Sequence, residues 1–421
     1  MSEDTDRQAI DNAIADAATY SNPEIFHDLY SRLRRDEPVR WTQPDGHNPF
    51  WTISRYQDIM NIERAQQQWI AAPRTVLRTI EREESIRRVT GSSQPMHSMM
   101  HMDEPDHRKY RRITQEWFMP PNLRTLTDSL DELASSFLDD MSAAGTEYDF
   151  GEDVAAKYTI RALMKIIGVP AEDEDLMIDI TQRFFSPADP SINKGKKIDL
   201  GNTLQGAFEY FNNLVAARRA DPRDDLATLL CNATIDGEPL SDHDRNSYFF
   251  LLAIGGHDTT AISLSELLLA LLQHPDQLER LREDRSLLPT AIDEGIRWGS
   301  PANHFMRTAT ADTEVAGTTI HEGEAVFLCY PSGNFDETAF DNPREFRIDR
   351  SPNRHLGFGF GVHQCLGQHL AKLEMTALFN QLLDRTESIE LAGEPGRLAS
   401  TFVSGVTSLP IRYRLRQAQL V

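Results

Sequence analysis

The chain has 421 residues, of which 65 are acidic and 43 basic, so its formal net charge is −22 at pH 7. This charge excludes nucleic acids and anionic membranes as the main binding partners. The 40% of residues that are apolar suffice for a large core, and no linker divides it. We therefore expect a single domain over residues 1–421, in which 1–22 form a polar N-terminal extension.

The sequence shows no sign of a membrane segment or of secretion. The N-terminus is polar and acidic without an apolar signal core, and no uncharged apolar run approaches membrane-spanning length. Three cysteines without paired spacing do not form a disulfide framework. These features predict a soluble, cytoplasmic protein.

The N-terminal part of the chain predicts scaffold elements and then an irregular segment. Apolar spacing predicts helices at 24–35 and 56–64 with a hairpin at 39–53 between them. Residues 71–102 lack a clear period and contain Met96, Met99, Met100 and Met102. Because methionine adapts its shape to apolar surfaces, this segment predicts a wall of a substrate pocket, although an irregular surface loop explains it equally well.

A cluster of charged residues follows at 103–112. His107 and Arg111 are four residues apart and therefore share one face of the expected helix. Such a cluster binds an anionic group or is simply a solvated helix face. Amphipathic helices are then expected at 122–142, 154–167, 172–183 and 202–219, with Phe184 near the end of the third and a polar loop at 188–201.

The longest helix is expected from Ser241, which forms a capping box with Asp244, to Gln273. Its apolar centre is interrupted by the run Gly-Gly-His-Asp-Thr-Thr at 255–260. These residues are poor helix formers, and a buried carboxylate is costly unless it is paired or used. The run predicts a functional site; a kink made by threonine back-bonding would leave Asp258 unexplained.

A glycine-rich loop at 354–367 leads into a helix, and Cys365 lies at the junction. So many glycines indicate that the backbone turns through positive φ or lies in close contact with another group. A thiolate at a helix N-terminus is a metal ligand or a nucleophile. His363 and His369 flank the cysteine as possible bases, but no CxxC spacing supports a zinc site. Glycine and phenylalanine beside the sulfur suit a flat hydrophobic partner better than a small ion.

The stretch 358–367 resembles the haem-binding signature of the cytochrome P450 family, Phe-Gly-x-Gly-x-His-x-Cys-x-Gly. The resemblance implies a mainly α fold with small β-sheets (α+β) and a haem b between the long central helix and the cysteine loop. In that fold Cys365 is the ligand of the iron, and the loop residues Phe358, Gly359, His363 and Gly367 surround the cofactor.

Other segments resemble further motifs of the same family, in the family's order. The run at 255–260 is similar to its oxygen-activation motif, which implies haem contact at Gly255 and Gly256 and catalytic roles for Asp258, Thr259 and Thr260. Glu294 and Arg297 match its Glu-x-x-Arg pair. The resemblance further implies that the haem propionates are bound by His107, Arg111, Arg307 and His355.

The resemblance implies a monooxygenase that inserts one atom of O2 into a C–H bond of a small hydrophobic substrate. Electrons would come from a 2Fe–2S ferredoxin and a separate FAD-containing NAD(P)H reductase, which would dock on the basic run at 108–112. Stretches 305–309, 352–359 and 365–375 are most similar to the bacterial enzyme that oxidises α-terpineol, which favours a monoterpene or an alkyl-aromatic hydrocarbon. Expected substrate contacts are Met99, Met100, Phe184, Ala302, Asn303, His304 and Val403.

Alternatives remain open at this point. Within the enzyme class, the substrate could be a steroid or a fatty acid. Outside it, the chain could be a haem-thiolate protein that binds a ligand without turnover, or a zinc or thiol enzyme that shares only the loop. The Asp258-Thr259 pair argues against a passive binder, because binding needs no proton relay.

Overall fold

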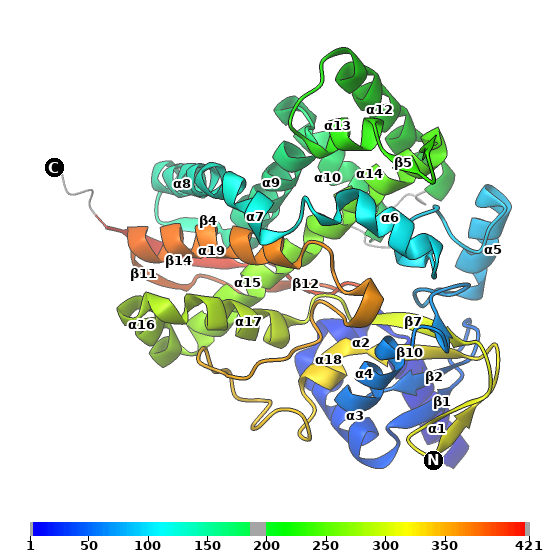
Figure 1. Ribbon diagram of the computed structural model, residues 1–421. Helices are drawn as coiled ribbons and strands as arrows, with labels where there is room; N and C mark the ends of the chain where they lie inside the picture. The colour runs from blue at the N-terminus through cyan, green and yellow to red at the C-terminus, as the bar shows by residue number, and fades with distance from the viewer. Residues whose placement is uncertain (1–2, 186–198, 417–421) are drawn as a thin grey trace.

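The computed structural model describes residues 3–185 and 199–416 (Figure 1). Helices make up most of the chain, and a five-stranded sheet lies at one side with the N-terminal helices around it. The predicted mainly α fold with small sheets is therefore confirmed. Most of the polar loop expected at 188–201 lies outside the described residues.

The main sheet combines strands from both ends of the chain. The predicted hairpin is present, and its second strand pairs in parallel with a strand nearly 300 residues later in the sequence. The order of the strands is β1 (Val39–Thr42), β2 (Phe50–Ile53), β10 (Ala325–Cys329), β7 (His304–Ala309) and β3 (Trp69–Ile70). Strand β10 is buried at every position, as expected for the centre of a covered sheet.

The polar N-terminus is part of the packed fold. Its first helices are α1 (Glu3–Ile14) and α2 (Ala17–Ser21). Ile14 and Tyr20 are buried, and the Tyr20 hydroxyl lies 2.8 Å from that of Tyr30 in α3 (Pro23–Asp36). Within the polar extension expected at 1–22, the described residues from Glu3 onward therefore include apolar side chains that pack into the core and anchor a mostly polar segment.

The remaining helices surround a central pair, which Figure 1 shows crossing the middle of the molecule. They are α4 (Tyr56–Arg64), α5 (Ile80–Thr90), α6 (Asp106–Gln115), α7 (Pro120–Leu123), α8 (Thr127–Ala144), α9 (Lys157–Ile167), α10 (Glu174–Phe185), α12 (Leu200–Ala220), α13 (Leu226–Cys231), α16 (Pro275–Glu283), α17 (Leu288–Gly299), α18 (Tyr330–Asn334) and α19 (Gln368–Arg385). A π-helical turn, η3 (Phe150–Ala156), precedes α9.

The central pair is α14 (Asp242–Gly256) and α15 (Asp258–Gln273), where one continuous helix was expected. Ser241 caps α14 as predicted, its hydroxyl accepting from the Asp244 N–H at 3.0 Å. The break lies at His257, whose backbone has φ −99° and ψ −76°. The Thr259 hydroxyl donates to the Gly255 carbonyl at 3.2 Å, so back-bonding by threonine accompanies the break.

Two small sheets complete the C-terminal part. One has the order β11 (Thr386–Leu391), β14 (Pro410–Leu415) and β4 (Glu147–Asp149), and the other pairs β12 (Gly396–Leu398) with β13 (Gly405–Ser408). The connection between β12 and β13 reaches back to Ala302, which forms a bridge with Val403. No helix in the described part of the chain is long and apolar enough to cross a membrane.

Candidate active site

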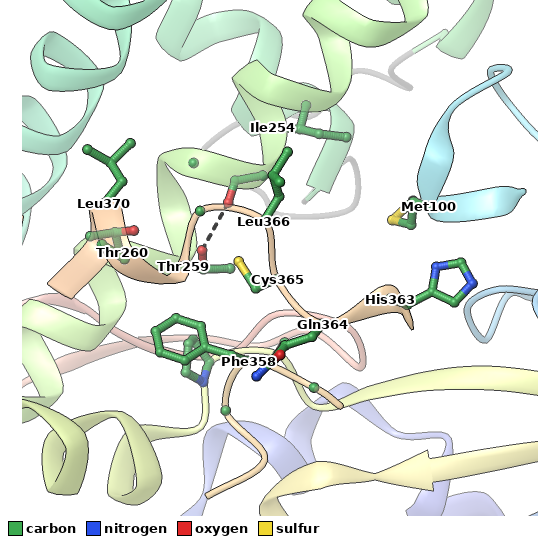
Figure 2. Close-up of a pocket in the computed structure, with 18 of the residues that line it drawn as sticks. Met100, Ile254, Thr259, Thr260, Phe358, His363, Gln364, Cys365, Leu366 and Leu370 are labelled. Carbon is green, nitrogen blue, oxygen red and sulfur yellow. Dashed lines mark hydrogen bonds between the residues drawn. The ribbon is translucent and has the colours of Figure 1, made fainter. Parts of the chain in front are cut away.

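A cavity of about 270 Å³ lies between the α14–α15 break and the cysteine loop (Figure 2). It brings together residues that are far apart in the sequence, and most of the predicted site residues line it. These are Met99, Met100, His107, Arg111, Gly255, Gly256, Thr259, Thr260, Ala302, Arg307, Phe358, Gly359, His363, Cys365, Gly367 and Val403.

The cysteine loop is held in shape by its own backbone. The Cys365 N–H donates to the Phe358 carbonyl at 2.8 Å. Gly359 and Gly361 have φ values of +65° and +71°, which side chains rarely permit. A Cβ at Gly361 would also lie 2.3 Å from the Glu63 carbonyl oxygen of α4. The glycines are therefore required by the turn and by the close approach of α4.

Cys365 is buried, and two groups near it favour its ionised form. Burial raises the pKa of its thiol, while the Gly367 N–H and the Arg111 guanidinium act in the opposite direction. Among residues 3–185 and 199–416, no group of three or more His, Cys, Asp or Glu side chains could hold a metal ion. A metal at Cys365 must therefore bring its other ligands with it, as the iron of a porphyrin does.

The alternative roles considered for Cys365 do not fit this geometry. A zinc site needs several protein ligands, which are not found in the described residues. A thiol enzyme needs a base beside the sulfur, but the His363 ring packs on His107, with 4.3 Å between ring centroids, and Figure 2 shows it turned away from Cys365. The zinc site is therefore set aside, and so is His363 as the base of a thiol enzyme.

One edge of the cavity is positively charged. His107, Arg111, Arg307 and His363 all line it. The pKa values of His107 and His363 are lowered, first by burial and then by these guanidiniums. The Nδ1 atom of His107 is buried without a hydrogen-bond partner. An anionic group would balance the guanidinium charge and accept a hydrogen bond from His107 Nδ1 when that nitrogen carries the proton, so this edge fits the propionates of haem.

Arg307 is fixed by a carboxylate that sequence reasoning missed. Glu63 of α4 lies 2.9 Å from the Arg307 guanidinium and accepts a 2.9 Å hydrogen bond from the Tyr330 hydroxyl. All three side chains are buried. An acidic residue near the end of a short amphipathic helix has the pattern of a surface residue, so the sequence carries no signal for this contact.

His355 lies outside the cavity lining, unlike the propionate ligand that was expected. Its Nδ1 accepts from the Gly357 N–H at 3.2 Å, and its Nε2 faces Asp293 at 3.4 Å. Both ring nitrogens therefore already have protein partners. His363, eight residues later, occupies the cavity edge in its place.

The three predicted catalytic residues are divided between two environments. Thr259 and Thr260 line the cavity, and Figure 2 draws both in the same close-up as Cys365. Asp258 does not line it; its carboxylate lies 3.2 Å from the Nδ1 atom of His257. Burial raises the pKa of Asp258, and His257 opposes this shift.

The expected substrate contacts are only partly at the cavity. Asn303 and His304 lie outside its lining, and both bond to the segment 400–404: the Asn303 amide donates to Ser400, and His304 Nδ1 faces the Thr401 carbonyl at 3.0 Å. The side chain of Phe184 is outside the described residues. Apolar lining residues that the sequence did not single out are Phe118, Leu163, Leu251, Leu252, Ile254, Phe305 and Phe402.

Behind the cysteine loop lies a fully buried ionic network. The Arg297 guanidinium binds the Glu294 carboxylate through two bonds of 2.7 and 2.8 Å, and Arg350 approaches the same carboxylate at 3.0 Å. Asn353 donates to it at 3.1 Å. The pair anticipated from Glu-x-x-Arg is thus the centre of a network that connects α17 to the segment leading into the cysteine loop.

Residues 83–391 match the family described as Cytochrome P450. Cytochrome P450-terp of Pseudomonas sp is 36% identical over 406 residues, which cover 94% of this chain and 95% of the relative. Steroid C26-monooxygenase of Rhodococcus jostii is 31% identical over 407 residues, covering 94% and 84%. Linalool 8-monooxygenase of Pseudomonas putida is 31% identical over 396 residues, covering 93% and 97%.

A solved structure agrees with these relatives. The crystal structure of CYP108D1 from Novosphingobium aromaticivorans superposes with a TM-score of 0.91 at 41% sequence identity. The match covers 97% of this chain and 99% of that one. The similarity therefore extends over nearly the whole chain.

Proposed function

The chain belongs to the cytochrome P450 family, and we propose that this monooxygenase oxidises a small terpenoid or alkyl-aromatic hydrocarbon. Family membership confirms the predicted haem cofactor, the predicted monooxygenase chemistry and the predicted kinship with the terpineol-oxidising relative. The passive ligand binder is thereby set aside as well. What remains to be proposed is the substrate, the electron donor and the roles of individual residues.

The observation that carries the substrate proposal is the apolar lining of the cavity around the two threonines. Side chains from η1 (Met99–His101), α14 and the β12–β13 connection meet there, namely Met99, Met100, Leu251, Leu252, Phe402 and Val403. Because these side chains are apolar and lie in one cavity with the hydroxyls of Thr259 and Thr260, a hydrophobic ligand is favoured. The relatives named Cytochrome P450-terp and Linalool 8-monooxygenase support a terpenoid as the substrate.

The proposed mechanism assigns a task to each group at the cavity. Haem, when bound, supplies the activation of O2 and the insertion of oxygen into the C–H bond. Cys365 holds the iron, and the cationic edge binds the propionates and orients the cofactor. Gly255 and Gly256 allow it to approach the helix backbone because they carry no side chain. Thr259 and Asp258 hold and move the protons that the reaction consumes.

We expect an optical titration of the ferric protein to distinguish the candidate substrates. A ligand that displaces solvent from the iron converts the spectrum from low-spin to high-spin. α-Terpineol and p-cymene should give this change at lower concentrations than a sterol or a fatty acid. A change with the large ligands alone would favour the second candidate, steroid oxidation, which the Steroid C26-monooxygenase relative supports.

For the electron donor we propose a 2Fe–2S ferredoxin that docks on the basic run 108–112 of α6. Two cations of this basic run are already paired, Arg108 with Glu104 at 2.8 Å and Lys109 with Asp236 at 2.6 Å. Arg112 is exposed, and the described residues include no acidic partner for it. Arg112 is therefore the residue on which docking to an acidic partner depends most.

The variant Arg112→Glu is expected to slow reduction by ferredoxin roughly tenfold at low salt, because it reverses a charge at the contact. Stopped-flow reduction of the ferric protein measures this rate. Arg414→Glu on strand β14 makes the same charge change on an exposed side chain and is the matched control. Equal rates for both variants would place the docking surface elsewhere.

A further inference from the structure

His257, at the break between α14 and α15, is the residue of the 255–260 run that the proposed function leaves unused. Its side chain is buried and lies outside the cavity lining. Three groups surround its ring nitrogens: the Ala156 carbonyl at 3.1 Å from Nε2, the Thr181 hydroxyl at 3.3 Å from Nδ1, and the Asp258 carboxylate at 3.2 Å from Nδ1. A buried histidine packed only for its bulk would not collect three polar partners.

These partners fix where the protons of His257 lie. A carbonyl oxygen only accepts, so the Ala156 contact requires a proton on Nε2. The Thr181 hydroxyl donates to the Ile178 carbonyl at 3.0 Å, which leaves a lone pair of its oxygen toward Nδ1. An ionised Asp258 would also present only lone pairs to Nδ1. If the imidazole were neutral and the carboxylate ionised, His257 Nδ1, the Thr181 oxygen and the Asp258 carboxylate would all be acceptors. No donor would then lie between them.

With the Thr181 hydroxyl in this orientation, two protonation states avoid the conflict, and both contain one additional proton; a hydroxyl turned to donate to Nδ1 would avoid it without that proton. In the first state, His257 is an imidazolium whose Nδ1–H donates to Thr181 and whose charge lies beside the Asp258 carboxylate. In the second, Asp258 is a neutral acid whose O–H faces Nδ1. In the part of the chain that the structure covers, His257 is the one charged or titratable group that acts on the pKa of the Asp258 carboxyl. The pair is thus isolated from other charges.

We propose that His257 is the positioning residue of Asp258, and that the two side chains hold one proton between them beside the cavity. Asp258 is released from this pair to pass the proton toward Thr259, the next residue, whose side chain lines the cavity. His257 stays bonded to the Ala156 carbonyl. After the Asp258 carboxylate has regained a proton from solvent, it contacts His257 again. The proposal rests on the monooxygenase function proposed above.

The overall reaction shows why such a proton store matters. Conversion of RH and O2 to ROH and H2O consumes two electrons, supplied by the redox partner, and two protons. When hydrogen peroxide replaces O2 and the electrons, RH and H2O2 give ROH and H2O with no net proton uptake. A residue that stores protons is therefore needed for the first reaction and not for the second.

Two variants separate the proton store from packing. His257→Gln keeps a donor for the Ala156 carbonyl but cannot hold the second proton, and His257→Phe removes both functions. With O2 and a surrogate ferredoxin system, both variants should form several-fold less product per O2 consumed and show a larger solvent isotope effect. Peroxide-supported turnover and the optical binding titration should be unchanged. His274→Gln, at the other end of α15, is the control, since His274 also faces a helix carbonyl.

Unchanged product per O2 in both variants would overturn the proposal. An equal loss in the O2-supported and peroxide-supported reactions would also overturn it, because that result indicates a purely structural role. If no test substrate is oxidised by the unaltered enzyme in either reaction, the substrate proposal fails and the assay does not address His257.

A spectroscopic measurement therefore tests the proton directly, without substrate. NMR spectra of the carbon monoxide complex of the full-length ferrous protein, with 13C-labelled histidine and aspartate, report both side chains at pH 7. His257→Gln and Asp258→Asn identify the two signals. We expect either an imidazolium with an ionised carboxylate or a neutral imidazole with a neutral acid. A neutral imidazole together with an ionised Asp258 would overturn the proposal.

Discussion

The variant Cys365→Ser is expected to lose at least roughly 10³-fold in kcat for O2-supported oxidation, equal to about 4 kcal/mol of activation free energy. Serine has nearly the same shape, so the loop, with its Phe358 contact, should persist. Its hydroxyl is not ionised at neutral pH and donates far less electron density to iron than a thiolate. The carbon monoxide difference spectrum of the reduced protein should accordingly lose the signature of thiolate ligation.

Cys231→Ser is the matched control for this prediction. Cys231 is partly buried at the end of α13, where its sulfur lies 3.7 Å from the Val215 carbonyl, and it does not line the cavity. The control should keep both the thiolate spectrum and the activity. A Cys365→Ser protein that retained the thiolate spectrum would show that another side chain holds the iron.

The variant Glu294→Gln is expected to lower the free energy of unfolding by about 3–5 kcal/mol, the typical effect of breaking a buried ion pair. The substitution keeps the shape of the side chain but leaves Arg297 and Arg350 buried without their shared carboxylate. Because Arg350 also ties the segment before the cysteine loop, the purified variant should contain less haem. Urea unfolding and the ratio of haem to protein measure the two effects.

An exposed acidic residue provides the comparison. Glu390 pairs with Arg412 at 3.2 Å, but both side chains are more than half exposed, at 65% and 52%. Glu390→Gln should therefore change the free energy of unfolding by no more than about 1 kcal/mol. If the free energy of unfolding of Glu294→Gln equalled that of Glu390→Gln, the buried network would fix geometry without adding stability.

The sequence predicted the cavity lining well where a residue is part of a continuous motif. Gly359 and Gly361 are needed for positive φ, and Cys365 follows them at a fixed separation, so the loop is specified locally. The same holds for Gly255 and Thr259, because a run of poor helix formers inside an apolar helix is visible in the composition of a few residues. In each case the physical cause lies within about ten residues of chain.

The contacts that the sequence did not predict join distant segments. The partner of Arg307 is Glu63, more than 200 residues earlier, and the partner of His355 is Asp293. His355 and His363 occur in the same loop, and nothing in their spacing shows which ring faces the cationic edge. Asn303 was expected in the cavity, but its bonds to 400–404 depend on how the C-terminal hairpin folds back.

The sequence by itself determined the family and singled out Cys365 and the 255–260 run, which meet at one cavity, because these are parts of short motifs whose conformations follow from local sterics. The tertiary structure alone decided which charges are paired. It placed Glu63 on Arg307, turned His363 toward His107, and set His257 beside Asp258 under the Ala156 carbonyl. Burial makes such pairings strong and selective, and burial is a property of packed elements rather than of neighbouring residues.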